Sequence, residues 1–300
     1  MSAINKIVKS ALVVFLGTIF GQVIGYLFRI IVARQDIALY GTYNLAISII
    51  TFLVPFVLLG LDQGLIRYIS YYKGKKQNQK ADVAISSALK IVFPVSVIFF
   101  LAVYFGSQTI ASWFNVENLA LFLRYFAFLI PLIAGYEIFI AVLSANKKMG
   151  LIVISRNIIN NLLMISIVLI MFVFGYFKAG VISAFLLSGI VTFFLLFIYS
   201  KRFFKFRKGF DKSLFSFSVA LLFLYTFFMI MTKIDTIMLG YFTDVEEVAL
   251  YNVAVPTSYL LLIFGMSLMS IYLPTITSKF FSEKKIDEEF KFTTKWIFIL

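Results

Sequence analysis

The sequence predicts an all-α, polytopic membrane protein, and three observations carry this prediction. Hydrophobic residues make up 62% of the 300-residue chain and charged residues only 14%, against about 45–50% and about 25% in soluble proteins. The apolar residues gather in runs long enough for a membrane-spanning helix, which needs about 20 residues. The loops between the runs alternate between strongly basic and weakly charged. Helices are expected because in lipid every backbone polar group must be satisfied within its own segment.

The spans are predicted in order from the N-terminus. The first follows Lys6 and Lys9 and exceeds the apolar core of about 7–15 residues in a cleavable signal peptide, so we expect a transmembrane helix. The predicted spans are Ser10–Ala33, Thr42–Ser70, Ala81–Gly106, Leu119–Ala145, Gly150–Phe174, Ala179–Ser200, Leu214–Gly240 and Tyr251–Thr277. Another apolar run begins near Phe292 and stops at Leu300, so we expect this chain to be the N-terminal part of a longer protein.

The basic residues predict the orientation of the chain in the membrane. Lysines and arginines crowd the N-terminus and every second loop, around residues 73–80, 147–148, 201–212 and 279–295, whereas the opposite loops hold only Arg34 and Lys178. Cytoplasmic loops of membrane proteins carry the excess of basic residues. We therefore expect a multi-pass protein of the cell membrane with its N-terminus in the cytoplasm. The same pattern explains the net charge of +13 without a nucleic-acid partner.

The longest basic loop, KRFFKFRKGFDKS, is the predicted joint between two helix bundles. GTYNLA, starting at Gly41, aligns with ALYNVA, starting at Ala249, and both segments open an inward-running helix. Two repeated bundles with a substrate site between them are common in secondary transporters, although chance similarity between two aromatic-rich helix starts also explains the match. The predicted division is a six-helix bundle over residues 1–200, a cytoplasmic linker over 201–213 and the start of a second bundle over 214–300.

The fifth span contains a polar stripe, ISRNIINNLL, that is costly to expose to lipid. Arg156 and Asn160 are four residues apart and share a helix face, and Asn157 and Asn161 share an adjacent face. Glu137, in the middle of the fourth span, lies at a depth where it can pair with Arg156. Two interpretations remain open: a polar lining of a substrate cavity, or interhelical hydrogen bonds that hold the bundle together.

Two charged residues also interrupt the seventh span, in FFMIMTKIDTIMLGYF. Lys233 and Asp235 are two residues apart, so they point to different sides of a helix and do not pair with each other. Arg29 of the first span lies at a similar outer depth. We therefore predict an Arg29–Asp235 gate between the bundles, with Lys233 facing the same cavity or reaching the interface. The alternatives are a static structural pair and no contact at all.

The composition argues against several chemical functions. The chain has no cysteine and no histidine, which removes disulfides, thiolate metal sites and the commonest general base. No catalytic residue, metal site or cofactor is predicted. A membrane-bound glycosyl- or acyltransferase is disfavoured further because the outer loops are short and the sequence has no paired-carboxylate D-x-D motif.

Five segments carry a family resemblance that extends along essentially the whole chain. They are INKIVKSALVVFLGTIFGQVIGYLFRIIVAR, LYGTYNLAISI, GLDQGLIRYISYYKG, KIDTIMLGYF and EEVALYNVAVP. Together they resemble the polysaccharide and oligosaccharide-lipid flippases of the MATE-like exporter superfamily. The resemblance implies a MATE-like two-bundle transporter fold, of which this chain supplies the first six-helix bundle and the first helices of the second.

The resemblance also implies a substrate. It would be a sugar or oligosaccharide on polyprenyl phosphate or diphosphate, moved from the cytoplasmic to the outer leaflet by alternating access. Arg29, Arg156 and Lys233 suit a phosphate, which arginine binds bidentately, and the asparagines suit sugar hydroxyls. The implied partners are the lipid-linked glycan, membrane lipids, and glycan polymerase or glycosyltransferase machinery. The alternative is a cation-coupled multidrug exporter of the same superfamily, for which Glu137 and Asp62 are the available carboxylates.

Overall fold

The computed structural model describes residues 3–116 and 118–256. The rest of the predicted span Tyr251–Thr277 and the run from Phe292 lie outside the described residues. The described residues up to Ala249 form one compact unit. The division into bundles at residues 201–213 remains a prediction.

All secondary-structure elements in residues 3–116 and 118–256 are helices, and these residues contain no strand. The elements are α1 (Ala3–Gln35), α2 (Ile37–Leu58), α3 (Leu61–Gly74), α4 (Asn78–Phe114), α5 (Leu119–Phe126), α6 (Leu129–Ala145), α7 (Met149–Ile152), the π-helix η1 (Val153–Ile159), α8 (Asn160–Val173), α9 (Phe177–Ser200), the 3₁₀-helix η2 (Lys201–Phe203) and α10 (Lys212–Phe242). A further helix begins at Val245.

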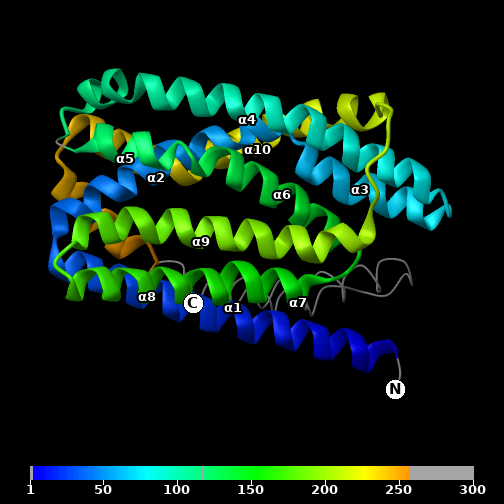
Figure 1. The fold of residues 1–300 in the computed structure, drawn as a ribbon, viewed down its shortest axis with the longest axis horizontal. Coiled ribbons are helices and arrows are strands. Elements are labelled where there is room, and N and C mark those ends of the chain that lie inside the picture. The colour runs from blue at the N-terminus through cyan, green and yellow to red at the C-terminus, as the bar shows by residue number, and fades with distance from the viewer. Residues whose placement is uncertain (1–2, 117, 257–300) are drawn as a thin grey trace, which may run out of the picture. The chain divides into compact units, whose positions relative to one another are not determined.

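These helices confirm an all-α, polytopic membrane protein. Six of them in the described part of the chain are long and apolar enough to cross a membrane, and the pair α5 and α6, bent by 41°, makes a seventh candidate. α2 is the most enclosed, with 67% of its apolar stretch buried, whereas only 11% of the stretch in α10 is buried. Within residues 1–249, α9 packs between α6 and α8, and α2 lies against α5, α6 and α10 (Figure 1).

Two spans that the sequence predicts as single helices are broken. The fourth span divides into α5 and α6 with a bend of 41°. The second span divides into α2 and α3 at Leu59 and Gly60, which both adopt left-handed backbone conformations with φ of 52° and 70°. A Cβ atom on Gly60 would lie 2.3 Å from the carbonyl oxygen of Ser218 in α10. Glycine therefore suits this position in two ways, because it tolerates positive φ and permits the close approach of α10.

α1 approaches the fifth span through glycines spaced four residues apart. A Cβ atom on Gly21 would lie 2.6 Å from the Cβ of Asn157, which is closer than real side chains pack. The facing pairs are Gly17 with Val153, Gly21 with Asn157, and Gly25 with Asn161. Small residues at this spacing let membrane helices bring their backbones close together.

α10 packs antiparallel along the second span. A Cβ on Gly64 of α3 would lie 2.2 Å from the hydroxyl oxygen of Ser218 near the start of α10, and one on Gly240 near the end of α10 would lie 2.5 Å from a methyl group of Leu45. The seventh span therefore lies against the second, and α1 packs against α2 and the fifth span.

The two similar segments GTYNLA and ALYNVA both lie in helices that begin four residues before them. The Asp36 side chain accepts a hydrogen bond from the backbone N–H of Leu39 at the start of α2 (2.8 Å). The Asp244 side chain likewise accepts from the N–H groups of Glu246 and Glu247 (3.1 and 3.0 Å). Both helices thus start with an aspartate N-cap at the same distance from the aligned tyrosine, which extends the predicted repeat.

Candidate functional site

An ion pair within the membrane region joins the fourth and fifth spans. The Nη2 atom of Arg156 lies 3.1 Å from Oε1 of Glu137, as the sequence predicts, and the two side chains are 46% and 19% exposed. The guanidinium also lies 5.8 Å from the centre of the Tyr136 ring. A paired arginine that keeps half its surface open retains N–H donors for a further anionic group.

Arg156 stands in the π-helix, which the sequence did not predict. η1 runs over Val153–Ile159 between two α-helical segments of the same span. Single π-turns inside α-helices are rare and are frequent at functional sites. Arg156 pairs with Glu137 of α6, whereas Asn157 and Asn161 contact α1, so the arginine and these two asparagines face different helices.

The three asparagines make interhelical hydrogen bonds. Asn157 Nδ2 donates to Oγ1 of Thr18 on α1 (3.4 Å), and Asn161 Nδ2 donates to the carbonyl of Gly21 (2.8 Å). Asn160 Oδ1 accepts from Oγ1 of Thr192 on α9 (3.1 Å). These contacts are those expected when the asparagines hold the bundle together; a role in binding sugar stays a prediction.

A second carboxylate lies near the ion pair. Asp62 of α3 accepts a hydrogen bond from the neighbouring Gln63 amide (3.0 Å), and α3 packs against α6. The packing of α3 against α6 thus brings a second carboxylate into the region of the Arg156–Glu137 pair.

Arg29 and Asp235 are the two residues of the predicted gate. Both side chains are exposed, and the ion pairs found between described side chains are Arg156–Glu137 and Arg207–Asp82. Asp235 takes part in other interactions, and α10 packs along α2 and α3 rather than along α1. Lys233 is only partly exposed, on the same helix as Asp235. A gate that pairs Arg29 with Asp235 therefore stays a prediction for another conformation.

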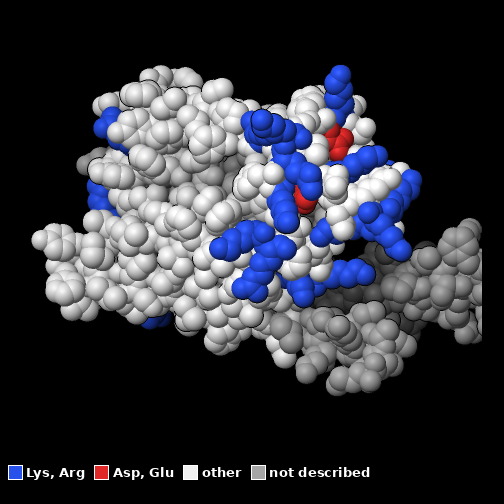
Figure 2. Space-filling model, turned by 45° about the vertical axis from the view of Figure 1, so that its right-hand side comes forward, with Lys and Arg blue, Asp and Glu red and all other residues white. Residues whose placement is uncertain are grey.

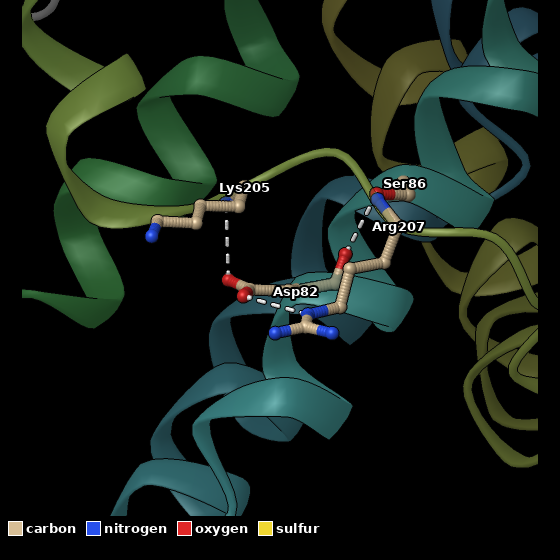
Figure 3. Close-up of polar contacts among 4 residues, drawn as sticks. All are labelled: Asp82, Ser86, Lys205 and Arg207. Atoms are coloured by element: carbon tan, nitrogen blue, oxygen red, sulfur yellow. Dashed lines mark hydrogen bonds and ion pairs between the residues drawn. The ribbon is translucent and has the colours of Figure 1, made fainter.

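The basic residues gather at one end of the molecule, as the alternation of the loops predicts (Figure 2). The linker of residues 201–211 crosses this end along α4 (Figure 3). Asp82 of α4 accepts hydrogen bonds from the backbone N–H of Lys205 (3.2 Å) and from Nε of Arg207 (3.3 Å), and Ser86 Oγ accepts from the N–H of Arg207 (2.9 Å).

The same face of α4 and the end of α3 hold the last part of the linker. Ser87 Oγ accepts from the N–H of Asp211 (3.0 Å), and Lys90 Nζ donates to the carbonyls of Arg207 and Gly209 (both 3.4 Å). The Tyr72 hydroxyl donates to Oδ2 of Asp211 (2.8 Å). Burial, and then the hydrogen bond to Asp211, raise the pKa of the Tyr72 phenol, so the hydroxyl stays a proton donor. The predicted joint is thus fixed to the first six spans.

A family model described as polysaccharide biosynthesis protein matches residues 7–280. The chain belongs to this family. Its members are flippase-like transporters within the MATE-like superfamily, which agrees with the multiple membrane-spanning helices of this chain. No curated protein and no solved structure matches the chain.

Proposed function

We propose that this family member moves a sugar or oligosaccharide, carried on polyprenyl phosphate or diphosphate, from the cytoplasmic to the outer leaflet. The observation that carries the proposal is the Arg156–Glu137 pair inside the membrane region, on a π-helix and next to other polar groups. Intramembrane charged residues are rare and mark substrate or ion pathways. Membership of the polysaccharide biosynthesis family supports a polysaccharide precursor as the cargo.

In this mechanism the phosphate of the substrate competes with Glu137 for Arg156. Arginine binds phosphate through two parallel N–H donors, and the exposed half of the guanidinium leaves room for such an exchange. The glycan would cross through the interior while the lipid tail stays in the bilayer. Removing one partner from an intramembrane pair leaves an uncompensated charge, so phosphate binding at Arg156 would release Glu137 and favour a change of conformation.

The basic end would face the cytoplasm, since cytoplasmic loops carry the excess of lysine and arginine. Arg29 and Lys233, at the opposite half of the spans, would receive the phosphate before it leaves to the outer leaflet. The Arg29–Asp235 contact would form when the outer side is closed and break when it opens. Asn157, Asn160 and Asn161 would hold α1, α9 and the fifth span together around this path.

Deletion of the complete gene in its own host tests the proposal. The measurement is the amount of lipid-linked glycan on the cytoplasmic leaflet, with complementation by wild type, Arg156→Lys, Arg29→Ala and Asp235→Ala. We expect accumulation that wild type reverses and that Arg156→Lys reverses poorly. Failure of the Arg29 and Asp235 variants would support the gate. Normal amounts on both leaflets in the deletion strain, with no second flippase gene present, would contradict the proposal.

A cation-coupled exporter is the second candidate function, and the carboxylates favour it. Asp62 and Glu137 stand on two helices that pack together, α3 and α6, and carboxylates within a membrane domain are able to carry protons. The two functions differ in a simple experiment. An exporter of cationic drugs would lower drug sensitivity in proportion to an imposed sodium or proton gradient, and Asp62→Asn would abolish this effect while leaving lipid-linked glycan unchanged.

A further inference from the structure

A pocket of about 490 Å³ opens at the basic end, where α3 ends and where α4 and α10 begin. Its lining includes neither Arg156 nor Glu137, and neither the predicted gate nor the predicted cavity includes it. Its lining residues are Arg67, Tyr68, Tyr71, Tyr72, Lys75, Gln77, Lys80 and Ser213. The charged side chains of this lining are all cationic.

Two of the three cations are held in place. The guanidinium of Arg67 stacks on the ring of Phe217 in α10, 4.3 Å from its centre. Lys75 Nζ donates a hydrogen bond to the Tyr71 hydroxyl (2.6 Å). That hydrogen bond, and then the charges of Lys75 and Lys80, lower the pKa of the Tyr71 phenol. The positive potential at the mouth of the pocket comes from Arg67, Lys75 and Lys80, which all line it.

The walls are joined by hydrogen bonds, so the pocket exists before any ligand binds. The Tyr68 hydroxyl donates to the carbonyl of Ser213 (3.0 Å), and the buried Tyr72 donates to Asp211. Both bonds tie the end of α3 to the beginning of α10. A preformed site loses less ordering entropy on binding than a site assembled by the ligand.

We propose that this pocket binds a phosphate or diphosphate group. Arginine and lysine are the side chains that bind phosphate, and the volume lies within the range of about 300–1,000 Å³ that is usual for small-molecule sites. The group arrives either on a lipid at the membrane surface, where basic pockets bind lipid head groups, or on a soluble molecule. The proposal requires no transport and stands apart from the proposed function.

Binding to the purified full-length protein tests it. One arm titrates inorganic diphosphate into protein in a neutral detergent. The other arm compares nanodiscs of phosphatidylcholine alone with nanodiscs that also contain a polyprenyl phosphate or phosphatidylglycerol. The readout in both arms is the rise in the midpoint of thermal unfolding, since a ligand that binds only the folded state stabilises it. Calorimetry gives the affinity for diphosphate.

The matched variants each remove two lysine charges from the basic end. Lys75→Gln with Lys80→Gln changes the pocket, and Lys147→Gln with Lys148→Gln changes a basic loop outside its lining. We expect the pocket variant to weaken binding by about tenfold or more, with little change in the control. All four lysines lie at exposed turns or helix ends, so we expect both variants to fold. An unfolding midpoint equal to that of the wild type, measured without ligand, would confirm this.

The two arms separate the sources of the phosphate. Binding of diphosphate in detergent that depends on the pocket lysines assigns the site to soluble phosphates as well as lipids. An effect confined to nanodiscs with anionic lipid, again dependent on the pocket lysines, assigns it to lipid head groups. Equal losses in the pocket and control variants, or no stabilisation in either arm, would overturn the proposal.

Discussion

Arg156 and Glu137 belong to consecutive spans, and their pairing follows from that closeness in sequence. Consecutive membrane helices joined by a short loop lie side by side, so the depth of two charged residues decides whether they meet. The distance of 3.1 Å confirms the predicted contact. Arg29 and Asp235 lie at similar depth but on the first and seventh spans, and depth alone does not say which distant spans are neighbours.

The pair predicts a non-additive effect of substitution on stability. Arg156→Met and Glu137→Met each leave one charge without its partner, whereas the double variant removes both charges. We expect each single variant to unfold more readily than the double variant, with a coupling energy of about 1 kcal/mol. A larger value is not expected because Arg156 is 46% exposed. Thermal unfolding of the four proteins in the same detergent measures this coupling, and additive effects would contradict the pair.

Arg156→Lys separates the role of the charge from the role of the guanidinium. Lysine keeps the positive charge beside Glu137, so we expect near wild-type folding. It loses the planar fork that binds phosphate bidentately, so we expect transport of a lipid-linked glycan to fall by about tenfold. Accumulation of protein in the membrane is measured beside transport. Transport at the wild-type rate would show that Arg156 serves only the fold.

At the scale of the helices, the order and approximate bounds of the spans follow from apolar runs alone. The breaks do not. α2 and α3 separate at Leu59 and Gly60, where α10 approaches the backbone, and this contact involves a helix about 160 residues later in the chain. The π-helix around Arg156 packs against α1, and no local sequence pattern predicts it.

The glycine stripe on α1 predicts a strong effect of a single added methyl group. Gly21→Ala places a Cβ 2.6 Å from Asn157, whereas Gly106→Ala in α4 places one 4.0 Å from its nearest neighbour. We expect Gly21→Ala to destabilise the protein by about 1–3 kcal/mol through overpacking and Gly106→Ala to be tolerated. The unfolding midpoint of each variant measures this difference. Similar midpoints would show that α1 and the fifth span lie farther apart.

The linker predicts a change in protease sensitivity. Asp82→Ala removes the acceptor of two hydrogen bonds from Lys205 and Arg207, so the linker would open more often. We expect trypsin to cut within residues 201–212 faster by about tenfold. Mass spectrometry of the fragments identifies the site. Glu246→Ala, an exposed acidic residue outside the linker, is the control, and equal cleavage of both variants would contradict a docked linker.

The face of α4 that holds the linker was readable in part from the sequence. Asp82, Ser86 and Lys90 are spaced four residues apart, which places them on one side of a helix, and a polar face at a basic loop indicates a partner there. The sequence does not name the partner, because an extended segment has no periodicity that would reveal its register on the helix. The pocket could not be predicted from the sequence either, because it combines the end of one helix with the beginnings of two others.

For the whole molecule, the docked linker has a consequence for the proposed mechanism of alternating access. α10 begins directly after a segment fixed to α4, with Asp211 as its N-cap, and it packs along α2 and α3. If the second predicted bundle moves relative to the first, there are two possibilities for α10. Either α10 moves together with the first six spans, or α10 slides along α2 and α3 at its glycine contacts. The predicted gate at Asp235 lies on this same helix.

The most direct test of the central claim is flipping by the purified full-length protein. The protein is reconstituted into vesicles that carry a labelled lipid-linked oligosaccharide on one leaflet, and its appearance on the other leaflet is followed with a reagent that does not cross the membrane. The account predicts transfer by wild type and much slower transfer by Arg156→Lys. Transfer no faster than in protein-free vesicles, from protein that unfolds cooperatively and is correctly inserted, would contradict it.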